Sequence, residues 1–120
     1  MSEVKFKNDR YYEETVVQAL IVDNNYAEQM SEVLNPSYFN MEYLKEVSKI
    51  MFAYHGKYKT FPSYKLLVNI IRAEVGDGVL KEQIVNYLLK IKKETAISDI
   101  EYVKNTSLEF FKKKALERAM

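Results

Sequence analysis

The sequence predicts an all-α protein of about six helices. Its 120 residues include only 3 glycines and 2 prolines, whereas a sheet protein needs turn residues about every eight to twelve positions. Apolar residues recur at helical spacing along most of the chain, with charged residues on the opposite faces. We therefore expect a small orthogonal helical bundle followed by a C-terminal antiparallel helical hairpin, both within one domain, residues 1–120.

The first two helices are predicted from apolar spacing and from the polar residues that interrupt it. Val16 and Leu20 share one face of a helix that spans roughly 10–22. Three polar residues, at positions 23 to 25, then break the pattern. Asn25 and Glu28 resemble a capping arrangement and predict that a short second helix begins there.

The third and fourth helices are predicted from their boundary residues and complete a bundle at 10–76. Asn40 is placed to cap the third helix, and Gly56 is a plausible left-handed stop. Pro62 forces the preceding residue out of helical geometry, so Ser63 is expected to cap the fourth helix.

The rest of the chain, 77–120, is expected to form the hairpin. Gly76-Asp77-Gly78 separates it from the bundle, and the sixth helix opens with the capping box Ser98-Asp99-Ile100-Glu101. Because only about six residues, 92–97, connect the two helices, they should fold back antiparallel. No stop residue follows the sixth helix, which predicts that the chain is the front of a longer polypeptide.

The two hairpin helices carry more apolar residues than a single helix–helix contact can cover, so part of this surface is expected to bind a partner. A second copy is the commonest partner, because closed homodimers dominate oligomers. The alternative is that both helices pack back onto the first four. The predicted interface residues are Ile84, Tyr87, Leu88, Ile91, Tyr102, Leu108 and Phe111.

The composition argues against catalysis, a cofactor or a metal site. There is no cysteine and a single histidine, His55, so thiolate and histidine-built metal sites are excluded. Gly76-Asp77-Gly78 is too short for a phosphate-binding loop and lacks its lysine. With no export signal and no long apolar run, we expect a cytoplasmic protein outside the membrane.

The formal net charge of +1 gives no long-range attraction to nucleic acid. The densest basic run, Lys112-Lys113-Lys114 with Arg118, complements the dipole near a helix C-terminus. The same strip is a candidate contact for nucleic acid or an acidic partner. The alternative function is therefore a small all-α nucleic-acid-binding regulatory protein that uses this helix.

Three segments, at 14–23, 33–39 and 96–103, carry a resemblance to the N-terminal domain of DnaB-type replicative DNA helicases, and this resemblance extends over most of the chain, from about Glu13 to Ala119. Glu14 to Asp23 is similar to that family's opening helix, and Val33-Leu-Asn-Pro-Ser-Tyr-Phe39 to its short segment ending in phenylalanine. Ala96 to Val103 resembles the family's connector and the start of its second hairpin helix. Ser63 and Tyr64 depart from the family, which has an apolar residue and aspartate after the proline.

The resemblance implies a non-catalytic oligomerisation and docking domain. In that family, paired hairpins build an N-terminal collar on a hexameric ring, and an ATP-dependent helicase domain follows in the chain. The collar receives the primase, DNA is bound by the full-length assembly, and a helicase loader is a further expected partner. The abundance of lysine over arginine suggests a phage-type member, acting in a bacterial or phage-infected cytoplasm.

Overall fold

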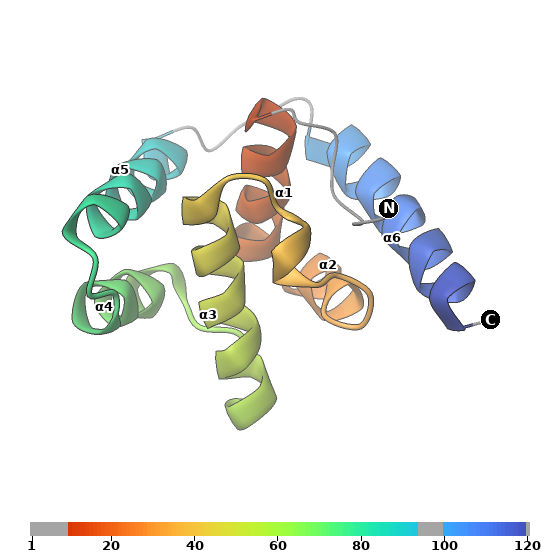
Figure 1. The fold of residues 1–120 in the computed structure, drawn as a ribbon, viewed down its shortest axis with the longest axis horizontal. Helices are drawn as coiled ribbons and strands as arrows, with labels where there is room; N and C mark the ends of the chain where they lie inside the picture. Colours follow the sequence, from red (N-terminus) through yellow and green to blue (C-terminus); the bar gives the residue numbers. More distant parts are fainter. Residues whose placement is uncertain (1–9, 94–99, 120) are drawn as a thin grey trace.

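A computed structural model describes residues 10–93 and 100–119 and confirms the all-α class. These residues form six α-helices, one short 3-10 turn and no strand (Figure 1). Among them, no helix is both long and apolar enough to cross a lipid bilayer. The elements are α1 (Arg10–Val22), α2 (Asn24–Met30), η1 (Pro36–Tyr38), α3 (Glu42–Tyr58), α4 (Tyr64–Glu74), α5 (Gly78–Lys93) and α6 (Ile100–Ala119).

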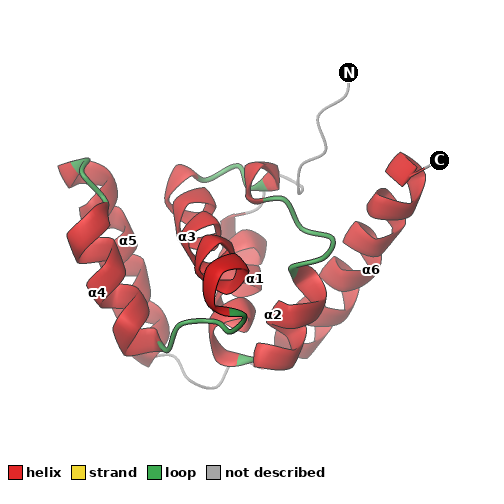
Figure 2. Ribbon diagram, turned by 90° about the horizontal axis from the view of Figure 1, so that it is seen from below, coloured by secondary structure: helices red, strands yellow, loops and turns green. Residues whose placement is uncertain are grey.

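The helices are arranged around α1 and α3, which lie in the middle of the molecule (Figure 1). On one side, α4 and α5 lie next to each other and pack against α3. On the other side, α6 packs along α1 and α2 (Figure 2). The described helices share one apolar core within a body of 40 × 31 × 29 Å.

The central position of α1 explains its sequence. Every side chain from Thr15 to Leu20 is buried, so this helix is covered on all sides instead of along one stripe. Its bounds, Arg10–Val22, agree with the predicted range. Glu13 and Gln18 are buried with the apolar residues, so their polar groups need partners inside the protein.

Two helix starts test the predicted caps. Ser63 caps α4 as expected, because its hydroxyl accepts a hydrogen bond from the Leu66 amide at 3.2 Å. The predicted cap at Asn25 is wrong. Asp23 caps α2 instead, and its carboxylate accepts from the Tyr26 amide at 3.1 Å. A carboxylate also suits the positive end of the helix dipole better than an amide does.

Both predicted ends of α3 are wrong. Asn40 makes no cap for its own helix, since its backbone and side-chain amides donate to Glu13 of α1 at 2.9 and 2.6 Å. Gly56 lies inside α3, which continues to Tyr58. The left-handed residue that ends the helix is Lys59, with φ 64°. The amide of Lys59 donates to the His55 carbonyl and closes the last turn.

The structure does not form the expected packed hairpin. α5 packs on α3 and α4, whereas α6 packs on α1 and α2, and the central helices lie between them (Figure 2). Helices from both sides of the Gly76-Asp77-Gly78 turn therefore contribute to one core. The predicted capping residues Ser98 and Asp99, and most of the predicted connection, lie outside the described residues.

Candidate interaction surfaces

Most of the predicted interface residues are buried inside this chain. Leu108 is half-buried, and Tyr102 is 68% exposed on α6. The fully covered residues are Ile84, Tyr87, Leu88, Ile91 and Phe111. The apolar rows of α5 and α6 are thus covered largely by the first four helices, which was the alternative expectation. A contact of this surface with a second copy stays a prediction. Of the seven residues, Tyr102 is the one whose side chain is largely exposed and accessible to a second copy.

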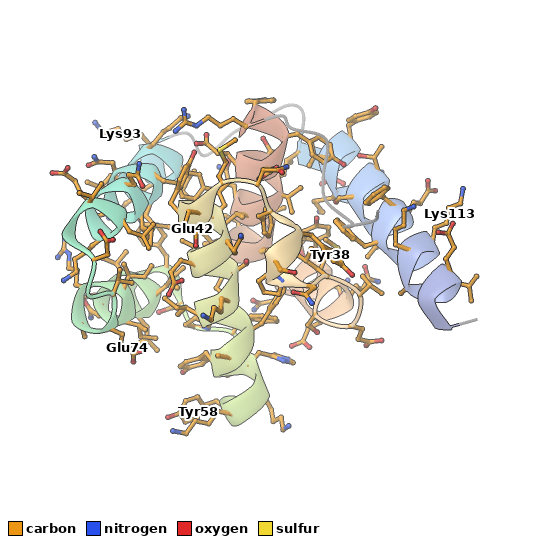
Figure 3. The ribbon with its side chains drawn as sticks, in the orientation of Figure 1. Tyr38, Glu42, Tyr58, Glu74, Lys93 and Lys113 are labelled. Carbon is orange, nitrogen blue, oxygen red and sulfur yellow. The ribbon has the colours of Figure 1, made fainter. Side chains whose placement is uncertain are left out.

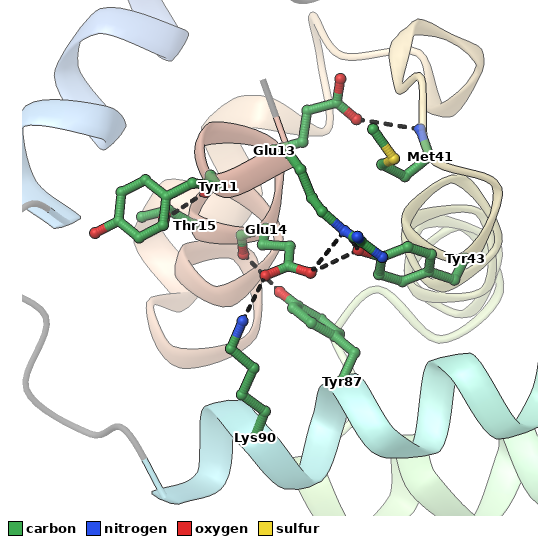
Figure 4. Close-up of polar contacts among 9 residues, drawn as sticks. Tyr11, Glu13, Glu14, Thr15, Met41, Tyr43, Tyr87 and Lys90 are labelled. Carbon is green, nitrogen blue, oxygen red and sulfur yellow. Dashed lines mark hydrogen bonds and ion pairs between the residues drawn. The ribbon is translucent and has the colours of Figure 1, made fainter. Parts of the chain in front are cut away.

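Tyr87 belongs to a polar cluster that joins α1, α3 and α5 (Figure 4). Its hydroxyl donates to the Glu14 carbonyl at 2.5 Å, and burial raises the pKa of Tyr87 well above its usual value. The Glu14 carboxylate accepts from the Tyr43 hydroxyl at 2.5 Å and from Lys90 at 3.0 Å. Arg10 donates to Tyr43 at 2.8 Å. Because these groups bond to one another, the cluster holds three helices together.

α6 is held on α1 and α2 by two pairs of hydroxyl groups. The Tyr26 and Ser107 hydroxyls lie 2.6 Å apart in a buried contact, and burial raises the pKa of Tyr26. The hydroxyls of Tyr12 and Thr106 lie 2.9 Å apart. The apolar contribution of α6 is small, and Val103 and Phe111 are its fully buried apolar residues within the part described. Polar contacts therefore set the register of this helix.

An ion pair adds to the same contact. Lys104 lies 2.5 Å from the carboxylate of Asp23, the residue that caps α2. The hydrogen bond from Lys104 is the main cause that lowers the pKa of Asp23, and the same contact raises the pKa of Lys104. Sequence periodicity gave no indication of these partners. The only signal is that α6 carries hydroxyl residues, Thr106 and Ser107, where an apolar stripe would be expected.

The predicted basic strip lies on the part of α6 that extends away from the body. Lys112 and Lys113 are exposed, and no ion pair between described residues involves them. Lys113 is labelled on this outer part of α6 in Figure 3. Lys114 contacts Glu117 at 3.5 Å and lies over the Phe110 ring. The side chain of Arg118 lies outside the described residues.

A groove of about 420 Å³ lies between α3 and α4. Its apolar lining includes Ile50, Ala53 and Ile70. The aromatic rings of Tyr54 and Tyr58, 4.6 Å apart, lie at the end of the groove nearest the end of α3. Charged residues of both signs complete the lining: Glu46, Lys49, Lys57 and Glu74. An apolar strip with a mixed-charge rim fits a protein helix better than a polyanion.

A second groove, of about 630 Å³, is lined mainly by residues 31–36 together with Tyr38, Phe52 and Ala115. Tyr38 also stacks on Phe111 of α6 with ring centroids 5.3 Å apart. Its lining mixes the polar residues Ser31, Glu32 and Asn35 with the apolar residues Val33, Leu34 and Pro36.

The described residues contain no group of histidines and carboxylates arranged to bind a metal ion. Comparisons with known proteins find no match: no family model, curated protein or solved structure is significantly similar to the chain. Function must therefore be argued from the surfaces of the molecule and from the resemblance in its sequence.

Proposed function

We propose that this chain is a non-catalytic module for self-association and partner docking, of the kind that forms the N-terminal collar of DnaB-type replicative helicases. In this proposal the full-length protein is an ATP-dependent hexameric helicase of phage type. The collar binds the primase and a helicase loader, and acts in the cytoplasm of a bacterial or infected cell. Support comes from the sequence resemblance and from one surface of the fold.

That surface is the outer part of α6, and its exposure is the structural observation that supports the proposal. The helix is anchored at Val103 and Ser107, and its C-terminal end extends away from α1 and α2 (Figure 2). Leu116, on this end, is 64% exposed. A leucine on an extending helix gains little from its own chain, whereas contact with a partner would remove its apolar surface from water.

Sedimentation velocity over a range of concentrations tests the self-association. We expect the 120-residue chain to form species larger than a monomer, and Leu116→Glu or Tyr102→Glu to shift the distribution toward monomer. Both positions are exposed, so the fold should survive, as circular dichroism can verify. Val79→Glu is the matched control, because Val79 is 71% exposed on α5, away from α6. Equal behaviour of all three variants would contradict the role of α6.

Two further measurements test the helicase assignment itself. A pull-down with the primase from the same genome should retain this chain. The reading frame of the gene should continue beyond Met120 into a strand followed by a Gly-x-x-x-x-Gly-Lys-Ser/Thr loop, which binds nucleotide phosphates. A gene without such a motor region would refute the helicase assignment and leave only a binding module.

The second candidate function is nucleic-acid binding, favoured by the exposed Lys112 and Lys113. Such a contact weakens steeply with salt, because each neutralised phosphate releases counterions. Fluorescence anisotropy with a labelled single-stranded oligonucleotide at physiological salt separates the two functions. Binding that is lost in the Lys112→Glu, Lys113→Glu double variant would favour the regulator, whereas no binding favours the docking module.

A further inference from the structure

Two stretches of the chain carry no acidic residue. None of the 17 aspartates and glutamates lies in 47–73, which covers most of α3, the loop after it and nearly all of α4. None lies in 83–93 either, which is most of α5. Both stretches carry lysines, several of them in the last turn of α5. Positive charge therefore accumulates wherever the fold places the two stretches next to each other.

The fold places the end of α5 against the start of α4. The Tyr64 hydroxyl, in the first turn of α4, donates to the Leu88 carbonyl of α5 at 2.6 Å. Lys92 lies over the Tyr64 ring, with its Nζ atom 5.6 Å from the ring centroid. Lys65 follows Tyr64 in the chain, and Lys93 follows Lys92. Three exposed lysines from two helices are thus gathered where α4 begins and α5 ends.

The end of α3 extends this basic surface. Lys57 lies over the Tyr58 ring at 5.4 Å, and Lys59 ends the helix. Lys59 and Lys65 are six residues apart, so their Cα atoms lie within about 20 Å of each other. In Figure 2 the connecting loop passes directly from α3 to the end of the α4–α5 pair at which α4 begins. We call the following five lysines the basic edge: Lys57, Lys59, Lys65, Lys92 and Lys93.

The lysines of the basic edge are accessible to a ligand. All five are exposed, and no ion pair between described residues involves them. Lys90 is not included, because its ammonium group pairs with Glu14 at 3.0 Å. Glu28 comes close to the end of α3, but its carboxylate lies 2.8 Å from His55. Glu94, the next residue after α5, lies outside the described residues.

The basic edge is distinct from the surfaces described above. Lys57 is its one member that also lines the groove between α3 and α4. The basic strip of α6 lies elsewhere, since Lys93 and Lys113 are labelled on opposite sides of the body in Figure 3. A ligand can therefore occupy the basic edge without contacting α6.

An aromatic ring lies beside the lysines at the end of α3. Tyr58 is 55% exposed, and its ring centroid is 4.6 Å from that of Tyr54. Bases of a single strand stack on such rings whatever their identity, while lysines neutralise the phosphates. In a duplex the bases stack on one another instead, and an acidic protein segment has no base to place on the ring. Exposed tyrosine together with unpaired lysines therefore favours a single-stranded nucleic acid.

We propose that single-stranded nucleic acid binds along the basic edge, with a base on the Tyr58 ring and phosphates on the lysines of α3, α4 and α5. The contact uses phosphates and ring faces, so it has little sequence preference. The inference goes beyond the proposed function, because it requires neither α6 nor self-association.

Fluorescence anisotropy of a labelled oligothymidylate with the 120-residue chain tests this contact. Lys65→Glu with Lys92→Glu should weaken binding about tenfold or more at physiological salt. It should also reduce the slope of log affinity against log salt by about 1.4, because each phosphate contact of a single strand contributes about 0.7. The control is Lys112→Glu with Lys113→Glu, which reverses two exposed charges on α6 and should bind like the wild type. Circular dichroism verifies that both variants are folded.

A second pair of variants tests the ring without changing any charge. Tyr58→Leu keeps an apolar side chain but removes the stacking surface, so it should weaken binding about fivefold or more. Tyr102→Leu is the matched control, because Tyr102 is a 68% exposed tyrosine on α6. This control should bind the oligothymidylate like the wild type.

Four outcomes would overturn the inference. A wild-type chain that does not bind the oligothymidylate, even at low salt, would do so and leave the proposed self-association and primase docking standing. Loss of binding in the α6 charge variant, with full binding in the Lys65 and Lys92 variant, would place the contact on α6. A duplex that binds as tightly as the single strand would exclude stacking on Tyr58. Binding to vesicles of anionic lipid without binding to the oligothymidylate would assign the basic edge to a membrane surface.

Discussion

The carboxylate of Glu13 should be one of the largest single contributions to the stability of this fold. It is fully buried in α1, yet it lies at the start of α3 (Figure 4). It accepts from the Asn40 amide at 2.9 Å, from the Asn40 side chain at 2.6 Å and from the Met41 amide at 3.3 Å. One helix thereby supplies the cap of another, and the carboxylate sits at the positive end of the α3 dipole.

Replacing Glu13 with alanine would remove the acceptor of these three partly buried donors. A hydrogen bond to a charged group contributes about 1.5–3 kcal/mol, and an orphaned buried donor costs about 1–3 kcal/mol. The three bonds are not additive, and water can enter the vacated space, so we expect Glu13→Ala to lower the free energy of unfolding by about 3–4 kcal/mol. Glu13→Gln keeps one acceptor oxygen and should cost about 1–2 kcal/mol.

Urea unfolding followed by circular dichroism measures both values. The control is Glu32→Gln, because Glu32 is exposed and the described residues give it no ion pair. This control should lie within about 0.5 kcal/mol of the wild type. The reasoning is refuted if the free energy of unfolding of Glu13→Ala also lies within about 0.5 kcal/mol of the wild type, since the carboxylate would then not stabilise the start of α3.

Three other substitutions test the contact of α6 and one strained residue. Ser107→Ala removes the partner of the buried Tyr26 hydroxyl and should cost about 1–3 kcal/mol in urea unfolding; a cost below about 0.5 kcal/mol would contradict the bond. The pKa of Asp23 is lowered in the fold. The pairing of Asp23 with Lys104 therefore contributes its full stabilisation of the fold above the pKa of the unfolded state, which is near 4, and this stabilisation is lost as the pH falls through the lowered pKa of the folded state. Asp23→Asn should remove less than about 1 kcal/mol at pH 7, because the pair is partly exposed, and less at pH 2 than at pH 7, as urea titrations at both pH values would show. Lys59→Gly relieves the left-handed backbone at φ 64° and should raise stability by about 0.5–1 kcal/mol, seen as a higher urea midpoint.

Local features of this fold could be predicted because their cause is local. Val16 and Leu20 share a face at i and i+4, so α1 could be located from spacing alone. Ser63 caps α4 with a contact three residues away. The cap of α3 could not be found in this way. Glu13 is 27 residues from Asn40, and nothing in the neighbourhood of either residue indicates the other.

The error in the hairpin has a comparable origin. The stripe that contains Ile84 and Leu88 shows that α5 has a buried face, and both residues are indeed buried. Periodicity does not say which helix covers such a face. The short connection predicted that α6 covers the apolar face of α5, whereas in the structure α3 and α4 cover it. In the candidate site, the exposure of Lys112 and Lys113 could be predicted from the sequence. The pairing of Tyr26 with Ser107 could not, because it depends on the tertiary position of α6.

The way α6 is held bears directly on what it can do. Hydroxyl pairs at Thr106 and Ser107 and the ion pair of Lys104 are directional, so they fix the rotation and register of the helix more narrowly than an apolar stripe would. The helix is 20 residues long, which is about 30 Å, and the part beyond Phe111 continues this fixed direction for about 12 Å. A contact made through such a rigid end meets the next copy at one angle. Repeating one angle either closes a ring or continues as a filament, so substitutions at Ser107, far from any partner, should change the size distribution of the assembly as well as the stability of the chain.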